Sequence, residues 1–384
     1  MIVSDLVEGD LRPTERARPF MLDEIYEQPR AIAATIDRHV DDETIFGSAL
    51  APVTAALAAS NRLIIAASGS SRHAGLAGEI MIEDLAGVAV DVEYASEYCY
   101  RSSHATADPV VLAITQSGET ADTIAALREA SGRGAATISI CNVPGATIAR
   151  EATASLLTAA GPERAVPATK SFTTQLVVLY LVALALARRN GRMTAEVARG
   201  HVDALRELTA GLVDKIAVWD SACARMADVY GAARTYLYLG RGVHYAIARE
   251  GALKLKEISY AHAEGYPAGE LKHGPNALVD QNCPVVVIAT HDPADPDSLL
   301  RYRKTLGTIA DIRAAGGSVI AVANERDEAA PALASDVLFV PACAELLLPI
   351  VEVIPLQLFA YHVARANGCD VDRPRNLVKS VVRE

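Results

Sequence analysis

The chain has 384 residues, of which 51% are hydrophobic and 22% charged, a composition typical of a globular protein. The net charge is −11 and no stripe of Lys and Arg stands out, which argues against a nucleic-acid partner. Six scattered cysteines without a Cys-x-x-Cys pair argue against a zinc site or a disulfide framework and fit a reducing cytoplasm.

The start of the chain lacks the layout of a signal peptide, and residues 1–18 are polar and predict an N-terminal arm. The longest apolar run, 176–187, is too short to span a bilayer, so we expect a buried core helix and no membrane partner. Between residues 21 and 59, apolar side chains recur at helical spacing, which predicts a helical cap over a sheet.

Strand-like and helix-like segments then alternate along the chain. Strands are predicted at 63–67, 88–94, 110–115 and 137–142. One helix is predicted to begin near residue 73, and a second to follow the loop TQSGET and run through residue 130. This alternation is typical of a doubly wound parallel sheet in an α/β protein.

The same pattern recurs in the second half, with strands predicted at 235–239, 285–289 and 318–323 and helices around 248–260 and from 297. Long helices between about 170 and 232 would join the halves. We therefore predict an internal duplication, with one subdomain at 19–200, a second at 201–370, and a C-terminal tail at 371–384.

The two halves differ in the loops that follow corresponding strands. The first carries TQSGET, with three hydroxyls, an amide and a glycine, whereas its counterpart THDPAD carries two aspartates. A polar loop that opens a helix at the carboxyl end of a parallel strand suits a phosphate, so we expect one phosphate site, in the first half. The competing interpretation is that these Ser and Thr residues only cap helices.

Four ionisable residues are candidates for chemistry, although none is decisive from its position alone. Lys254 and Glu257 are three apart on a predicted helix and share a face, which fits either a surface salt bridge or a carboxylate base tuned by a cation. His273 lies in a Gly/Pro-rich loop and could be an acid, a base or a surface imidazole. Lys379 lies in the C-terminal tail.

Long ordered segments carry a resemblance to a known family. The run EGALKLKEISYAHAEGYPAGELKHGP at 250–275, together with TQSGETADT and DVDRPRNLVKSV, resembles the isomerase half of the glutamine:fructose-6-phosphate amidotransferases, or glucosamine-6-phosphate synthases. The resemblance extends from about Phe20 to Glu384. It implies a pair of sugar isomerase (SIS) domains with the tail folded over the active site.

The resemblance also implies roles for individual residues. Glu257 corresponds to the base that moves a proton between C1 and C2, with Lys254 as its supporting cation. His273 corresponds to a ring-opening histidine supplied by a neighbouring subunit, and Lys379 to the lysine that forms a Schiff base with the ketose. The positions implied to contact phosphate are Ser71, Thr115, Gln116, Ser117 and Thr120, and those implied to contact sugar are Ser70, Val166 and Val378.

The chain also departs from the synthase pattern. It starts Met-Ile-Val and its first cysteine is Cys99, so we expect no glutaminase nucleophile. Ser68 stands where the synthase commonly has cysteine, and GPERAVPATKS looks more like SIS-type glucosamine-6-phosphate deaminases. The preferred prediction is therefore a cytoplasmic deaminase that converts glucosamine 6-phosphate to fructose 6-phosphate and ammonia.

Three alternatives stay open at this point. They are a glutamine-independent synthase or hexose 6-phosphate isomerase, a deglycase for a sugar-phosphate amine conjugate, and a non-catalytic sugar-phosphate sensor.

If His273 acts across an interface, the chain is at least a dimer. No metal or organic cofactor is expected, because the only cation that the chemistry requires is a lysine.

Overall fold

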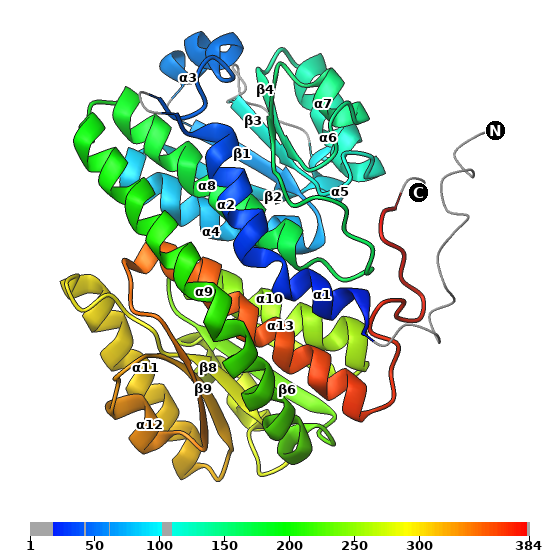
Figure 1. Ribbon diagram of the computed structural model, residues 1–384, viewed down its shortest axis with the longest axis vertical. Coiled ribbons are helices and arrows are strands. Elements are labelled where there is room, and N and C mark those ends of the chain that lie inside the picture. Colours follow the sequence, from blue (N-terminus) through cyan, green and yellow to red (C-terminus); the bar gives the residue numbers. More distant parts are fainter. Residues whose placement is uncertain (1–17, 42–43, 61, 102–109, 382–384) are drawn as a thin grey trace.

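The computed structural model describes residues 18–41, 44–60, 62–101 and 110–381, so the predicted N-terminal arm lies, apart from Arg18, outside the described residues. Two five-stranded sheets, in which every strand pair is parallel, form the frame of the molecule (Figure 1). The strands are β1 (Arg62–Ala67), β2 (Ala89–Tyr94), β3 (Val110–Ile114), β4 (Thr137–Cys141) and β5 (Ala154–Leu157) in the first sheet, and β6 (Thr235–Gly240), β7 (His262–Pro267), β8 (Val285–Ile288), β9 (Val319–Asn324) and β10 (Asp336–Val340) in the second.

The two sheets have the same topology. The first has the order β2-β1-β3-β4-β5 and the second β10-β9-β8-β6-β7, which is the same order when read from its other edge. This confirms the predicted pair of doubly wound α/β units. Every residue of β3 and β4 is buried, as expected for central strands of a sheet that is covered on both faces.

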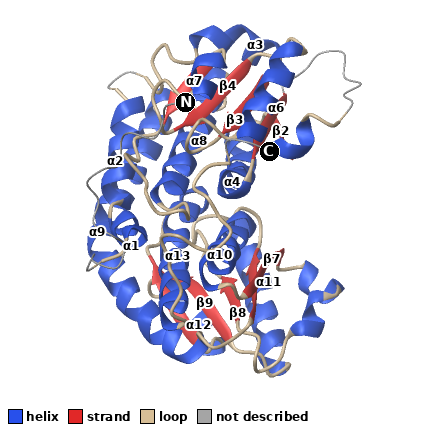
Figure 2. Ribbon diagram, turned by 90° about the vertical axis from the view of Figure 1, so that its right-hand side faces the viewer, coloured by secondary structure: helices blue, strands red, loops and turns tan. Residues whose placement is uncertain are grey.

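Helices cover both sheets and connect the two halves. They are α1 (Phe20–Tyr26), α2 (Gln28–His39), α3 (Thr54–Ala59), α4 (Gly69–Ala86), α5 (Ala95–Tyr98), α6 (Ala121–Gly132), α7 (Thr147–Glu151), α8 (Lys170–Arg189), α9 (Ala195–Tyr230), α10 (His244–Ser259), α11 (Pro296–Ala314), α12 (Ala329–Leu333) and α13 (Leu348–Ala366). In Figure 2, α4, α10 and α13 lie between the two sheets, and α4 contacts α10 where the halves meet. The limits predicted for the subdomains stay a prediction, and residue 200 falls within α9.

Two helices, α8 and the segment Glu345–Ala366 that includes α13, are long and apolar enough to cross a membrane. Both are mostly buried inside the protein, with 94% and 89% of their most apolar windows covered. They are therefore core helices, as predicted for the apolar run at 176–187.

The structure differs from the predicted elements in two respects. The helix expected from residue 73 begins at Gly69, directly after the end of β1, so that Ser70 and Ser71 belong to its first turn. The strands β5, β7 and β10 were not predicted. The sequence of β7 is HAEGYP, which lacks an aliphatic run and ends in proline, and β7 is tolerated as a strand because it lies at the edge of its sheet.

Corresponding glycines allow the central helices to pack closely. A Cβ atom on Gly78 of α4 would lie 2.9 Å from Leu179 Cδ2 on α8. A Cβ atom on Gly251 of α10 would lie 2.9 Å from Leu356 Cδ1 on α13. Both contacts are closer than normal packing permits, so the two halves use glycine for the same purpose.

We expect Gly78→Leu to destabilise the protein by about 1–3 kcal/mol, because the added side chain overpacks the contact with α8. The matched control is Gly211→Leu, since Gly211 is an exposed residue of α9 with nothing within 4 Å of its Cβ position. There, the gain in helix propensity should stabilise by about 1 kcal/mol or less. Urea unfolding of both variants checks this, and equal midpoints would contradict the packing argument.

Candidate active site at the first switch point

The strand order places a candidate site at the carboxyl ends of β1 and β3. These strands are neighbours in the sheet, but their connections continue in opposite directions, to β2 on one side and to β4 on the other. Such a switch point is where open α/β sheets bind ligands. The loops after β1 and β3 lead into the N-termini of α4 and α6, whose free N–H groups favour an anion.

A pocket with a volume of about 170 Å³, partly open to solvent, lies at this switch point. Every predicted site residue except His273 lines it: Ser70, Ser71, Thr115, Gln116, Ser117, Thr120, Val166, Lys254, Glu257, Val378 and Lys379. Ser68, the position that departs from the synthase pattern, lines it as well. The fold therefore brings together residues that are up to 311 positions apart in the sequence, from Ser68 to Lys379.

The hydroxyls of this pocket do not act as helix caps. Ser68 and Thr120 are the N-cap residues of α4 and α6, and neither makes a side-chain capping hydrogen bond. Thr120 Oγ1 instead lies 2.8 Å from Thr115 Oγ1 across the loop. The interpretation that these residues only cap helices is therefore wrong at both N-cap positions.

Gly118 gives the loop after β3 its shape. Its φ of +72° lies in the left-handed region, and a Cβ atom there would come within 2.4 Å of Ala146 Cβ. Glycine is thus required both by the backbone conformation and by the space. The sharp turn leaves Thr115, Ser117 and Thr120 on the pocket side of the loop.

Lys254 and Glu257 form a buried ion pair. The Lys254 side chain is 1% exposed, and its Nζ lies 2.6 Å from Glu257 Oε2 and 3.4 Å from Glu250 Oε1. It also donates to Ser70 Oγ at 3.1 Å. Burial alone would lower the pKa of Lys254, but Glu257 and Glu250 outweigh it and raise this pKa, so the side chain stays a cation. The alternative of a surface salt bridge is therefore wrong.

Glu250 contacts the Lys254 ammonium, as Glu257 does. Its side chain is fully buried and also contacts His73 of α4, with 2.8 Å between Glu250 Oε2 and His73 Nδ1. Burial would raise the pKa of Glu250, but Lys254 and His73 lower it overall. The charged Lys254 thus lies directly beside the partly exposed Glu257, and a carboxylate open to a pocket is a group that can act as a base.

The C-terminal tail closes one side of the pocket and passes beside α1 (Figure 1). Ser380 Oγ lies 2.9 Å from Ser117 Oγ, and the N–H of Ala121 at the start of α6 donates to the Val381 carbonyl at 3.0 Å. Lys379 Nζ reaches inward to the carboxylate of Glu163, on the loop before α8. Glu163 was not predicted, and the only signal available was its place in the segment GPERAVPATKS.

His273 is the one predicted residue that a single chain does not bring to the pocket. It lies at the end of a short 3₁₀ helix, η3 (Glu270–His273), where its side chain is exposed. A role for His273 in this pocket therefore requires a second chain, and its role stays a prediction.

The corresponding switch point of the second half, between β6 and β8, is filled by the protein's own charges. His244, in the first turn of α10, has Nδ1 2.8 Å from Glu352 Oε1 and Nε2 3.2 Å from Glu345 Oε1. Arg301 binds the same Glu345 carboxylate, and Thr290 donates to Glu352. Buried carboxylates thus stand where the first half offers hydroxyls to an anion, which agrees with a phosphate site in the first half alone.

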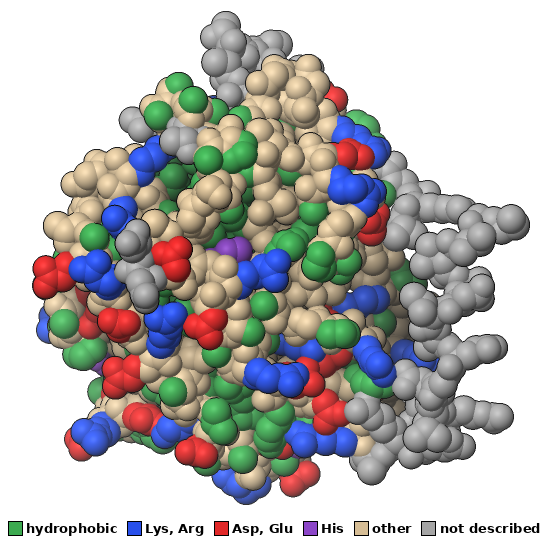
Figure 3. All heavy atoms as spheres, turned by 45° about the horizontal axis from the view of Figure 1, so that its top comes forward, with side chains coloured by type: hydrophobic (Ala, Val, Ile, Leu, Met, Phe, Trp, Pro, Cys, Tyr) green, Lys and Arg blue, Asp and Glu red, His purple; other side chains and the backbone are tan. Residues whose placement is uncertain are grey.

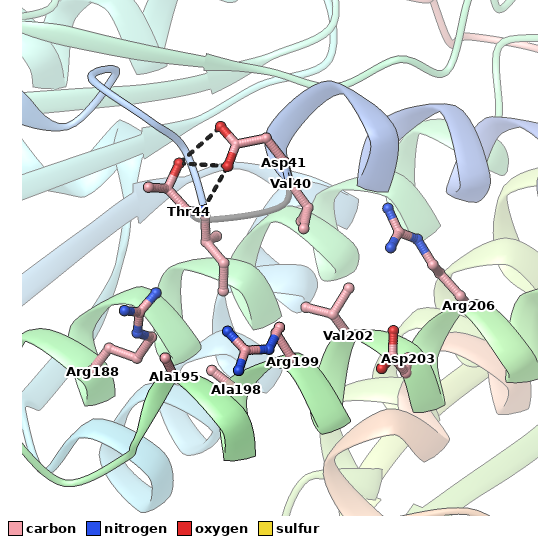
Figure 4. Close-up of a pocket in the computed structure, with 11 residues that line it drawn as sticks. Val40, Asp41, Thr44, Arg188, Ala195, Ala198, Arg199, Val202, Asp203 and Arg206 are labelled. Atoms are coloured by element: carbon pink, nitrogen blue, oxygen red, sulfur yellow. Dashed lines mark hydrogen bonds between the residues drawn. The ribbon is translucent and has the colours of Figure 1, made fainter.

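Other surface features lie apart from the pocket. Figure 4 shows a second hollow, bordered by Val40, Asp41 and Thr44 and by Arg188 and Arg199 of α8 and α9. It contains none of the predicted site residues. On the face drawn in Figure 3, acidic and basic side chains are interspersed. Among the residues that the structure describes, no group of three or more His, Cys, Asp or Glu side chains could hold a metal ion.

The fold is that of a doubly wound α/β protein with a candidate site at its first switch point, and the chain belongs to the SIS domain family, whose model matches residues 56–185 and 230–366. It is 46% identical over 371 residues to a glutamine–fructose-6-phosphate aminotransferase (isomerizing) of Chlorobaculum tepidum, covering 95% of this chain and 58% of that protein. A Thermus thermophilus relative of the same name is 45% identical, with 95% and 59% covered. The chain thus spans somewhat more than half the length of these relatives.

Solved structures agree with this placement. The C-terminal domain of glucosamine-fructose-6-phosphate aminotransferase from Francisella tularensis superposes with a TM-score of 0.84 at 36% identity, covering 95% of this chain and all of that domain. A glucosamine-6-phosphate deaminase from Thermotoga maritima has the same fold, with a TM-score of 0.73 at 20% identity and 94% and 99% covered. The chain therefore matches the isomerase part of the aminotransferases.

The buried cluster of the second half predicts a pH dependence of stability. Burial would lower the pKa of His244, but Glu352 and Glu345 outweigh it and raise this pKa to about 9. Because the folded pKa exceeds the ordinary 6.5, the stabilisation is complete below pH 6.5 and is lost as the pH rises through 9. His244→Gln should lower the unfolding free energy at pH 6.5 by on the order of 2 kcal/mol and flatten its fall between pH 6.5 and 9.

The control is His262→Gln, since that side chain is 60% exposed. If the unfolding free energy of His244→Gln depends on pH as that of the unmodified protein does, the buried cluster is not the source of the pH dependence.

Proposed function

We propose that this protein interconverts glucosamine 6-phosphate and fructose 6-phosphate plus ammonia, with deamination as the net direction when ammonia is scarce. The observation that supports this most directly is the meeting of three groups in one pocket: a hydroxyl-lined pair of helix N-termini, the Glu257 carboxylate and the Lys379 amine. The first suits a phosphate, the second a proton transfer, and the third an imine. The preference for deamination rests on the segment 161–171, part of which forms a wall of the pocket.

In the proposed reaction, the open-chain aminosugar binds with its phosphate at Ser71, Thr115, Gln116, Ser117 and Thr120. Glu257 removes the proton from C2 and returns it to C1, which converts the 2-amino aldose into a 2-imino ketose. Lys254 remains charged beside Glu257 and faces the negative charge that develops on the intermediate. Ser70, Val166 and Val378 contact the sugar.

Lys379 then completes the exchange at C2. Its amine adds to the imino carbon and ammonia leaves, which gives an imine between Lys379 and C2. Water hydrolyses this imine to the ketose and the free lysine. The sum is one glucosamine 6-phosphate and one water converted into one fructose 6-phosphate and one ammonia. We place the protein in the cytoplasm, since its six cysteines are scattered along the sequence without a Cys-x-x-Cys pair.

The direct test follows ammonia and fructose 6-phosphate from purified protein supplied with glucosamine 6-phosphate. We expect equal amounts of both products, and we expect Lys379→Ala and Glu257→Gln each to lower kcat by about 10²–10⁴-fold. Activity of Glu257→Gln equal to that of the unmodified protein would exclude the proton-transfer role. If glucosamine 6-phosphate forms from fructose 6-phosphate and ammonium but the reverse reaction is not seen, the protein works as a synthase. If no product forms in either direction, the deglycase or the sensor is favoured.

The exposed position of His273 leads to a second prediction, that active sites are shared between two chains. Glu257→Gln and His273→Ala should each be nearly inactive alone. After mixing and reassociation in equal amounts, half of the dimers combine both variants and carry one intact site, so activity should return to about a quarter. No recovery upon mixing, with dimer exchange confirmed by mass, would contradict a shared site.

A further inference from the structure

Glu163 is a fully buried carboxylate whose surroundings are built to bind it. It lies on the loop before α8, and its side chain is 0% exposed. Its Oε1 accepts hydrogen bonds from the backbone N–H groups of Thr169, at 3.0 Å, and Ser171, at 3.1 Å. Its Oε2 accepts from the Ser171 hydroxyl at 2.6 Å and contacts Lys379 Nζ.

These partners keep the carboxylate ionised inside the protein. An unpaired charge in such a site is costly, and removing the partner of a buried ion pair is strongly destabilising. Burial would raise the pKa of Glu163, but the Lys379 ammonium and the hydrogen-bond donors lower it overall. The loop therefore presents a fixed negative charge to the tail.

Glu24 of α1 stands behind this loop and holds its backbone. Its Oε1 accepts from the N–H groups of Arg164 and Ala165. Burial and the charge of Glu163 raise the pKa of Glu24 to about 7, although Lys379 lowers it. Lys170 points to the other side of the loop, toward Glu27, so Lys379 is the cation that contacts Glu163.

The backbone of the tail is anchored independently of this ion pair. The Asp372 carboxylate accepts from the N–H groups of Phe20, at 2.9 Å, and Met21, at 2.8 Å. The N–H of Val166 donates to the Asp372 carbonyl at 2.9 Å. The tail thus has attachments besides Glu163, whose own contact is with one amine of the tail.

We propose that Glu163 is the positioning residue and counter-ion of Lys379, an inference that rests on the proposed function of this lysine. When the lysine adds to the C2 carbonyl of fructose 6-phosphate, the N–C2 bond forms, the C2–O bond breaks and water leaves. Overall, one ammonium and one carbonyl give one protonated iminium and one water, so the nitrogen carries a single positive charge before and after. The amine attacks in its neutral form, and the proton that it gives up leaves with the carbonyl oxygen in the water. Glu163 faces the positive charge of the ammonium before the step and of the iminium after it, so the carboxylate need not reorganise.

The test compares Glu163→Gln with Glu24→Gln, a matched change in a buried carboxyl that bonds to the same loop backbone. Fructose 6-phosphate is added, the imine is reduced with borohydride, and the adduct on Lys379 is measured by mass across the pH range, together with kcat and KM. In Glu163→Gln we expect kcat to fall by about 10- to 100-fold while KM changes little. We also expect the pH dependence of adduct formation to change, because the amine loses the carboxylate that contacts it. Glu24→Gln should change kcat and the midpoint of this pH dependence less than Glu163→Gln does, since Glu24 bonds to the loop backbone whereas Glu163 contacts Lys379.

The outcomes separate the two proposals. An unmodified kcat and midpoint in Glu163→Gln would overturn the role of Glu163 while leaving the proposed function in place. If the unmodified protein forms no adduct and no product, the proposed function fails and this role fails with it. If Glu163→Gln does not fold, Glu163→Asp decides, since it keeps the charge and shortens the reach. A reduced kcat at an unchanged midpoint supports the proposal, and an unmodified kcat overturns it.

Discussion

The candidate site depends on one buried cation, the ammonium of Lys254. It lies on α10, a helix of the second half, and binds Glu257 and Glu250 on its own helix and Ser70 on α4 of the first half. Glu250 in turn contacts His73 of α4. Since the pocket hydroxyls come from the first half and the carboxylates from the second, this set of charges fixes the two halves relative to each other at the place where the proposed chemistry occurs.

The molecule has two sheets of the same topology, but their switch points differ in chemistry. Both sheets create a switch point with a helix N-terminus at its edge. In the first half, Gly118 shapes a loop whose hydroxyls remain free of capping roles. In the second, Glu345 and Glu352 supply internal anions to His244 and Arg301. The first copy therefore keeps an open pocket at its switch point, whereas charged side chains of the protein itself occupy the second.

The loop and the tail show how a pocket can be completed by the last segment of a chain. Asp372 anchors the tail to the start of α1, Ser380 contacts Ser117 in the loop after β3, and Val381 contacts the start of α6. Between these two attachments, Lys379 projects toward Glu163. An amine held in this way loses less conformational freedom when it reacts than one on a free terminus.

The sequence alone predicted the fold class, which the structure confirms, and it named most of the residues that line the candidate pocket. Aliphatic runs separated by helices predicted parallel sheets, and the loop Thr115–Thr120, the pair Lys254 and Glu257, and the long matching segments indicated the phosphosugar site. It failed for β7, whose sequence HAEGYP has no strand pattern and which is held as a strand by β6.

Only the tertiary structure could decide whether Lys254 was buried, whether His273 reached the pocket of its own chain, and which carboxylate faced Lys379. Glu163 and Lys379 are 216 residues apart. Neither has a local pattern that points to the other, and their contact exists only because the tail is anchored beside the loop before α8. Burial and long-range pairing arise from packing of the whole chain, and for that reason they were not readable from spacing alone.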